Sequence, residues 1–352
     1  MACCPTCAWL AIRATAEFRM KRKLLRCVAL TLVAGCLSAA GWAQPDAEDA
    51  RHWLEKMIQA TQTLNYEGTF IFVQGPHLEA MRIIHSCDAN GERQLLISLN
   101  GPHQEIVVTS NSVTRLAPGQ REAFPGADFQ RSPFPLSVPR DLGRLEGHYE
   151  FKLLGEDRIA GLAARVIAIK PRDAWRYGYR IWLDQRHGIV LRSALLDGKG
   201  YPIEQLMFTD VQIKPDIDKS VFASPLPRRD ASPKTDRQDP RPPVGEPVTH
   251  SAWRIVELPK GFKKVLHNRF TKSPGHHSTE HLVFADGLAT ISVFLEQLDG
   301  APLLQGGSQL GSMSAFGTVV EGYQVLVVGE VPAATVQHIA TSIHRDPEAE
   351  RP

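Results

Sequence analysis

Cysteine is scarce in this chain outside its first segment. Of the six cysteines in 352 residues, five lie within the first 43 positions: Cys3, Cys4, Cys7, Cys27 and Cys36. If that segment is removed, Cys87 is the one left, and a single cysteine cannot form an internal disulfide. We therefore expect packing to stabilise the fold, and the remaining 309 residues suffice for two ordinary domains.

Long hydrophobic runs are missing as well. The apolar stretch at 28–40 is shorter than the ~20 residues that a membrane-spanning helix needs. A basic segment at 20–23 precedes it and small residues at 41–43 follow it. This order is typical of a secretory signal peptide, so we expect residues 1–43 to be a leader that starts at Met20 and is cleaved after Ala43.

A lipoprotein signal is the alternative reading of the same leader. Residues 33–36 (Val-Ala-Gly-Cys) resemble a lipoprotein cleavage box, which would place an acyl chain on Cys36. Both readings export the protein, and we expect it in the periplasm.

Charge of one sign is not in excess. The chain has 40 Lys and Arg against 38 Asp and Glu, and six of the basic residues and one acidic residue lie in 1–43. The remainder thus holds 34 basic and 37 acidic residues. The slight basicity of the whole chain belongs to the leader, so we expect no nucleic acid partner.

Paired carboxylates and metal-ligand spacings are also lacking. The acidic residues of the expected strands are scattered: Glu67, Glu105, Glu150, Asp184 and Glu204. Solvated positions on strand surfaces explain them better than acid–base catalysis. His276, His277 and His281 have no cysteine or carboxylate pair nearby, so we expect histidines of an exposed loop and no metal site.

Two further motifs lack what catalysis requires. Cys87 follows His85 closely, but no third orienting group is recognisable. The glycine-rich stretch 306–311 lacks the Lys-Ser/Thr ending of a phosphate loop, and we expect a mobile connection there. We therefore expect neither an enzyme nor a cofactor; an envelope hydrolase that uses Cys87 or a histidine remains the weaker alternative.

Residues 45–223 have the pattern of one helix followed by some ten antiparallel strands. The helix begins at Asp46, and its apolar residues recur every three or four positions: Ala50, Trp53, Leu54, Met57 and Leu64. Strands are expected at 66–74, 80–86, 94–99, 105–110, 112–117, 148–154, 164–170, 176–184, 189–196 and 201–213. Residues 118–147 contain five prolines, so we expect this segment to be irregular.

The strand expected at 176–184 carries large side chains on both faces. Tyr177, Tyr179, Ile181 and Leu183 alternate with Gly178, Arg180, Trp182 and Asp184. One helix cannot cover ten such strands, and surplus apolar surface indicates a ligand groove or a partner site. Candidates for that groove are Tyr66, Phe70, Phe72, Tyr177, Tyr179 and Leu183, although the sequence leaves open which strand face points inward.

Three arginines are candidates for binding carboxylates or phosphates. Arg82, Arg176 and Arg180 lie on expected strands, where a guanidinium can donate two hydrogen bonds to one anion. A solvated strand face explains them equally well.

A proline-rich linker separates a second, smaller domain. Residues 224–250 hold seven prolines and few apolar residues, which is typical of a semi-extended tether. Residues 251–346 are expected to form a small α+β domain. Its strands are expected at 253–258, 265–270, 281–284, 289–297 and 324–329, before a helix that Pro332 opens. Ser292, Phe294 and Glu296 are candidates for contact with a partner, or for buried sheet.

Several segments in order resemble the RseB/MucB family of periplasmic negative regulators of the sigma-E envelope-stress pathway. They are 64–70 (Leu-Asn-Tyr-Glu-Gly-Thr-Phe), 81–85 (Met-Arg-Ile-Ile-His), 176–184, 258–262 (Leu-Pro-Lys-Gly-Phe), 286–289 (Asp-Gly-Leu-Ala), 292–296 and 327–332 (Val-Val-Gly-Glu-Val-Pro). The resemblance covers essentially the whole chain after the leader. It departs at Tyr323, where the family pattern has a histidine after the glycine.

The resemblance implies both a fold and a function. The fold is an α+β, mostly antiparallel structure: a curved half-barrel like that of the LolA/LolB lipoprotein carriers, with a covering helix, and a smaller C-terminal α+β domain. The function is to bind the periplasmic domain of an inner-membrane anti-sigma factor, to shield it from site-1 proteolysis, and to release it when lipid or lipopolysaccharide fragments appear. The alternative is a periplasmic carrier or chaperone for lipids or lipoproteins, and a homo-oligomer is left open.

Overall fold

The structure of the protein is a computed structural model. It describes residues 45–89, 91–109, 112–118, 120–125, 138–222, 245–271, 277–300, 302 and 304–346. The predicted leader, with Met20, Cys36 and Ala43, lies outside the described residues, as do His276 and most of the predicted linker. Within the described residues, no helix is both long enough and apolar enough to cross a membrane.

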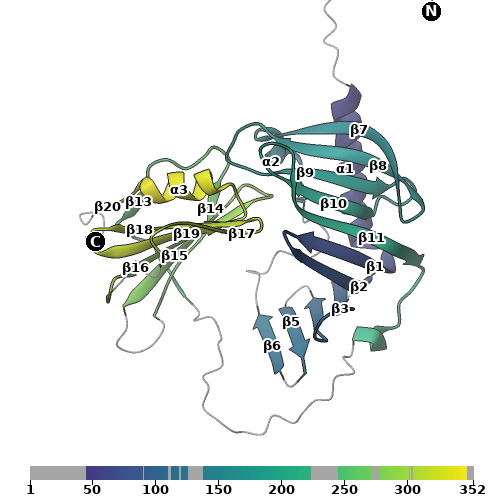
Figure 1. Ribbon diagram of the computed structural model, residues 1–352, viewed down its shortest axis with the longest axis horizontal. Helices are drawn as coiled ribbons and strands as arrows, with labels where there is room; N and C mark the ends of the chain where they lie inside the picture. The colour runs from purple at the N-terminus through teal and green to yellow at the C-terminus, as the bar shows by residue number, and fades with distance from the viewer. Residues whose placement is uncertain are drawn as a thin grey trace, which may run out of the picture. The chain divides into compact units, whose positions relative to one another are not determined.

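One helix and an eleven-stranded antiparallel sheet make up the first part of the described chain (Figure 1). The helix is α1 (Pro45–Thr63). The strands are β1 (Asn65–Gln74), β2 (His77–Asp88), β3 (Gly91–Ser98), β4 (Glu105–Thr109), β5 (Ser112–Ala117), β6 (Gln120–Pro125), β7 (Tyr149–Ile159), β8 (Leu162–Pro171), β9 (Gly178–Asp184), β10 (Val190–Leu196) and β11 (Pro202–Lys214). Their order in the sheet is β6-β5-β4-β3-β2-β1-β11-β10-β9-β8-β7.

Strand β1 joins the two halves of this sheet, because it pairs with both β2 and β11. Phe70, for example, lies opposite Met81 on β2 and Phe208 on β11. β11, the last strand of this sheet in sequence, therefore lies beside β1, the first. Two short helical segments complete this part, α2 (Gly143–Glu146) and the 3-10 helix η2 (Lys219–Phe222).

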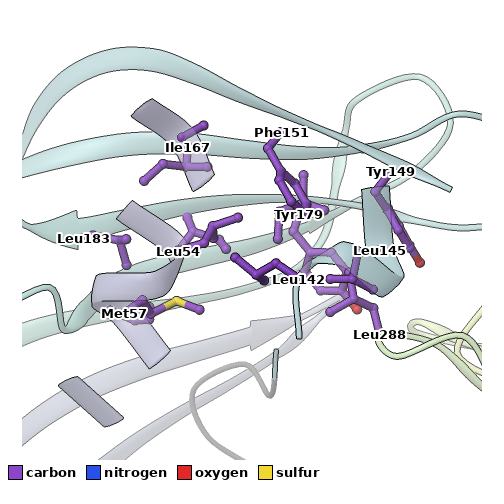
Figure 2. Packing of buried hydrophobic residues seen from close by; sticks show 14 of the residues in the cluster. Leu54, Met57, Leu142, Leu145, Tyr149, Phe151, Ile167, Tyr179, Leu183 and Leu288 are labelled. Carbon is purple, nitrogen blue, oxygen red and sulfur yellow. The ribbon is translucent and has the colours of Figure 1, made fainter. Parts of the chain in front are cut away.

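Helix α1 covers one face of strands β7 to β10. Its residues Ala50, Leu54 and Met57 belong to a buried cluster that includes Ile181 and Leu183 of β9. Figure 2 shows the side chains of Leu54 and Met57 directed toward those of the sheet. The three- and four-residue spacing of the helix residues thus produces the predicted apolar face.

A seven-stranded antiparallel sheet forms the C-terminal part. Its order is β12 (Glu246–Pro247), β14 (Lys263–Thr271), β15 (Ser278–Ala285), β16 (Thr290–Gln297), β19 (Tyr323–Gly329), β18 (Met313–Val320) and β17 (Gly306–Leu310). Helix α3 (Ala333–Thr341) follows Pro332 and packs on β18 and β19. β13 (Trp253–Ile255) pairs with β20 (Ile343–Arg345) in a separate ribbon. The expectation of a mostly antiparallel α+β fold is confirmed.

Several local predictions were wrong. His281 was expected in an exposed loop but lies half-buried on β15, and Glu105 and Asp184 were expected to be solvated but are buried. Residues 118–147 are not wholly irregular, because β6 pairs residue by residue with β5 and α2 follows later. The connection expected at 306–311 is largely the strand β17, paired with β18. Neither strand of that hairpin was predicted, since small residues such as Gly306 and Gly317 hide the alternation that marks a strand. The strand expected at 253–258 ends at Ile255.

Candidate functional site

A buried ion pair connects the segment before β9 to the loop between β15 and β16. Arg176 lies just before β9 begins and is only 1% exposed. Its Nε donates a hydrogen bond to Oδ2 of Asp286 at 2.5 Å. The side chains of both residues are fully buried. Removing one partner of such a pair would leave a buried charge without compensation, which is strongly destabilising.

The guanidinium of Arg176 has further partners on all sides. It forms an ion pair with Asp173 and donates to the main-chain carbonyl of Lys260. Its Cζ lies 4.7 Å from the ring centroid of Phe262 and 5.9 Å from that of Tyr149. A planar cation held between aromatic rings and carboxylates fits this environment better than a lysine ammonium would.

Both carboxylate oxygens of Asp286 accept hydrogen bonds. Oδ1 accepts the main-chain N–H groups of Leu288 at 2.9 Å and Ala289 at 2.7 Å. Oδ2 accepts the Tyr149 hydroxyl at 2.9 Å in addition to Arg176. Burial, reinforced by the Asp286 carboxylate, raises the pKa of Tyr149, so this phenol remains a donor at physiological pH.

Two glycines allow the loops of the smaller sheet to approach this closely. Gly261 has φ +93°, and a Cβ there would overlap the imidazole of His148. Gly287 has φ +108°, and a Cβ there would lie 3.0 Å from Cδ2 of Leu145. Both positions therefore require glycine for conformation and for space.

An apolar contact accompanies the polar ones. Leu288 belongs to the same buried cluster as Leu142, Leu145 and Tyr149, and Figure 2 shows it beside Leu145. We call this set the Arg176 junction, and it comprises Leu145, Tyr149, Asp173, Arg176, Lys260, Phe262, Asp286 and Leu288.

Five of the six predicted groove residues share one sheet face, and Tyr177 lies just before β9 begins. Through the strand register, the face of Phe70 and Phe208 continues across β10 to Tyr179 and Ile181, where α1 packs. Tyr66, Phe70, Tyr179 and Leu183 are buried in the core on this face, whereas Phe72 is half-buried; Tyr177 is buried in the same cluster as Tyr179. The strand face that the sequence left open is thereby assigned, and lipid binding by these residues stays a prediction.

The other candidate residues lie apart from one another. Arg82 is exposed and pairs with Glu67 at 3.1 Å, and Arg180 is exposed on β9. Neither is brought together with Arg176. On β16, Ser292 accepts or donates a hydrogen bond with His281 at 3.1 Å, and the His281 ring stacks on Phe294 with centroids 4.3 Å apart.

Glu296 also lies on β16, two residues beyond Phe294. The three candidates of this strand alternate with the core residues Ile291, Val293 and Leu295. They therefore lie on the sheet face that points away from that core, and contact with a partner stays a prediction.

Cys87 and His85 do not form a catalytic pair. The Cys87 thiol donates to the carbonyl of Gln62, and burial raises its pKa, which disfavours the thiolate. The His85 nitrogens instead contact the carbonyl of Leu64 at 2.9 Å and Glu92 at 3.1 Å. Among the described residues, no three His, Cys, Asp or Glu side chains gather in a way that could hold a metal ion.

Sequence reasoning found Arg176 but missed its partners Tyr149, Phe262 and Asp286. The segments 258–262 and 286–289 carried the family resemblance, yet nothing in the sequence indicated that they meet at Arg176. The available signal was glycine beside them, at Gly261 and Gly287, where a close approach of main chain could have been suspected.

Comparison with known proteins agrees with the resemblance seen in the sequence. Residues 49–226 match the MucB/RseB N-terminal domain, and residues 247–344 match the MucB/RseB C-terminal domain. The sigma factor AlgU regulatory protein MucB of Pseudomonas aeruginosa is 31% identical over 334 residues, which is 93% of this chain and 100% of that protein. The sigma-E factor regulatory protein RseB of Escherichia coli K12 is 30% identical over 90% of this chain and 96% of its own.

Solved structures agree as well. A crystal structure of MucB in complex with MucA(peri) is 28% identical, covers 86% of this chain and 99% of that chain, and has a TM-score of 0.63. A structure of the Pseudomonas aeruginosa MucA/MucB complex covers 85% of this chain and 99% of that chain at 29% identity, with a TM-score of 0.64. The chain belongs to the MucB/RseB family of non-catalytic sigma factor regulatory proteins.

Proposed function

We propose that this protein acts in the periplasm, where it binds the periplasmic domain of a transmembrane anti-sigma factor. The observation that supports this most is the structure of the relative MucB with MucA(peri), because the similarity extends over 86% of this chain. The predicted leader supports the compartment. In this proposal the bound regulator shields the anti-sigma factor from the site-1 protease, which keeps the sigma factor inactive.

Lipid or lipopolysaccharide fragments would release the anti-sigma factor. A ligand lowers the affinity for a partner only if it prefers the partner-free state, and the loss of affinity equals that preference. Acyl chains need apolar surface, and Tyr66, Phe70 and Phe72 supply it on the face that carries α1. Because Tyr66 and Phe70 are buried, entry of an acyl chain would require side chains or α1 to move.

Titration calorimetry tests the binding of the anti-sigma factor. The purified protein is titrated with the periplasmic domain of its own organism's anti-sigma factor, and with that of MucA from Pseudomonas aeruginosa. We expect saturable one-to-one binding, and an unrelated periplasmic domain of similar charge is the control. Absence of binding to both domains would overturn the proposal.

The lipid half has its own experiment. The same titration is repeated with an acylated glycolipid and with its deacylated form. We expect the acylated form to weaken partner binding at least tenfold and the deacylated form to leave it unchanged. An affinity that neither form alters would remove lipid release, while stoichiometric lipid extraction without partner binding would favour a carrier.

A further inference from the structure

The buried ion pair that joins the two sheets is made by two loop residues, Arg176 and Asp286. In the described part of the chain, each extensive contact between helices and strands lies within one sheet and its own helices. Contacts across the two include the Arg176 junction, the hydrogen bond from Thr335 to the carbonyl of Trp175, and the close approach of Gln74 to Gly311. Interfaces between domains that are small and polar permit relative motion, whereas large apolar ones prevent it.

The central interaction of the junction selects a geometry more than it adds stability. Burying Arg176 and Asp286 costs both side chains their hydration, and their attraction offsets that cost only in good geometry. The geometry is good here, because Asp286 accepts four hydrogen bonds and Arg176 donates three. A small displacement of either loop would break several of these bonds together, so intermediate positions are disfavoured.

The sequence that connects the two sheets has the composition of a linker. The sequence between Phe222 and Gly245 is 22 residues long and rich in proline and charge. The sequence therefore predicts a tether between the two sheets, and these residues lie outside the described ones.

We propose that the Arg176 junction is a latch that holds the two sheets in one arrangement and opens as a unit. In the closed state Arg176 is bonded to Asp286 and Lys260. In the open state both charges are solvated, and each sheet keeps its own fold, because each has a buried cluster made only of its own residues. Opening uncovers Tyr149, Phe262 and Leu288, which the closed junction buries or packs.

Two single variants and their combination test whether the ion pair controls opening. Arg176→Met keeps the packing on Phe262 but leaves the Asp286 carboxylate unpaired. Asp286→Asn keeps an acceptor for the N–H groups of Leu288 and Ala289 but removes the charge. The double variant has no buried charge left, so it should be less open than Arg176→Met alone.

Distances between spin labels report the open population. The chain without residues 1–43, which hold five further cysteines, carries Cys87→Ser and labels at Leu162→Cys in the large sheet and Val265→Cys in the small one, both at exposed positions. A second pair at Leu162→Cys and Leu78→Cys, both within the large sheet, shows whether that sheet stays folded.

We expect the unsubstituted junction to give one narrow distance distribution between the sheets. In Arg176→Met and in Asp286→Asn, the fraction of molecules with a longer distance between the sheets should be at least tenfold larger than in the parent. The distance distribution of the label pair inside the large sheet should not change. The double variant should lose part of that population. An unchanged distribution in both single variants would overturn the latch, as would a parent that is already broad.

The remaining possible outcome is the loss of folded structure, and this outcome would also contradict the proposal. If both single variants broaden the distances inside the large sheet or lose their circular dichroism signal, the ion pair is a folding element and not a latch. Two chemically different variants are used so that the failure of one to fold does not end the experiment.

Discussion

The indole of Trp175 stacks on the imidazole of His338, with ring centroids 4.5 Å apart and planes inclined by 22°. Trp175 precedes Arg176, and its carbonyl accepts a hydrogen bond from Oγ1 of Thr335 at 3.0 Å. Both partners lie on α3. The segment before β9 is therefore attached to α3 as well as to the loops that hold Arg176.

The hydrogen bond from Thr335 should contribute measurably to stability. Thr335 is fully buried, so Thr335→Val should lower the free energy of unfolding by about 1 kcal/mol, measured by urea denaturation. Thr341→Val is the matched control, because its hydroxyl bonds only within the exposed end of the same helix. Equal effects of the two substitutions would show that the bond to Trp175 contributes nothing.

Gly261 should not tolerate a methyl group. Gly261→Ala places a Cβ on the ring of His148 and also strains a main chain at φ +93°. Gly322→Ala has similar strain, at φ +80°, but open space around the new methyl group. We expect Gly261→Ala to cost at least 1 kcal/mol more than Gly322→Ala in urea denaturation, at the order of magnitude of core overpacking. Similar costs would mean that His148 rotates away freely.

Leu288 should behave as a core residue although it lies in a loop. It is 8% exposed within the cluster of Leu142 and Leu145, so Leu288→Ala should destabilise the protein by about 2–4 kcal/mol. Leu310→Ala, at a position 75% exposed, should change the free energy of unfolding by less than about 0.5 kcal/mol. A small effect at Leu288 would indicate that its contact forms only part of the time.

Stability should fall below pH 4.5 because of Glu280. Burial alone would raise the pKa of this carboxyl, but hydrogen bonds from His267, Arg269 and Ser251 lower it from 4.5 to about 2. Between these pH values the unfolded state binds the proton and the folded state does not. The contribution is therefore complete above pH 4.5 and is lost as the pH falls toward 2.

Glu280→Gln measures this contribution. At about 1.4 kcal/mol per pKa unit, the wild type should lose roughly 3 kcal/mol more than the variant between pH 5 and pH 2. Thermal unfolding at several pH values records the difference, and Glu246→Gln, at an exposed position on β12, serves as the control. Parallel pH curves for Glu280→Gln and the wild type would contradict the assigned hydrogen bonds.

The periodic parts of the fold could be predicted from the sequence. The helix that contains Leu54 and Met57, and strands such as β9, have apolar residues at the spacing of their secondary structure. The hairpin of β17 and β18 could not be predicted, because β17 is mostly glycine and polar residues and the apolar residues of β18 do not alternate regularly with polar ones. Its pairing with β19 supplies the order that local preference lacks.

The site was only partly predictable for a different reason. Arg176 was chosen for its guanidinium, yet its chemistry depends on Asp286, which lies 110 residues away in sequence. A strand position such as Arg180 looked equivalent in the sequence, and only the structure separates an exposed arginine from a buried one. Contacts between distant loops leave no periodic signal, so no inspection of spacing would have paired these residues.

The most direct test of the proposed function is the rate at which the site-1 protease cleaves the anti-sigma factor. Purified anti-sigma factor from the same organism is digested with and without a saturating amount of this protein, and cleavage is followed by gel densitometry. We predict that cleavage slows at least tenfold and that acylated glycolipid restores the original rate. A cleavage rate that stays the same although the two proteins are bound would contradict the account.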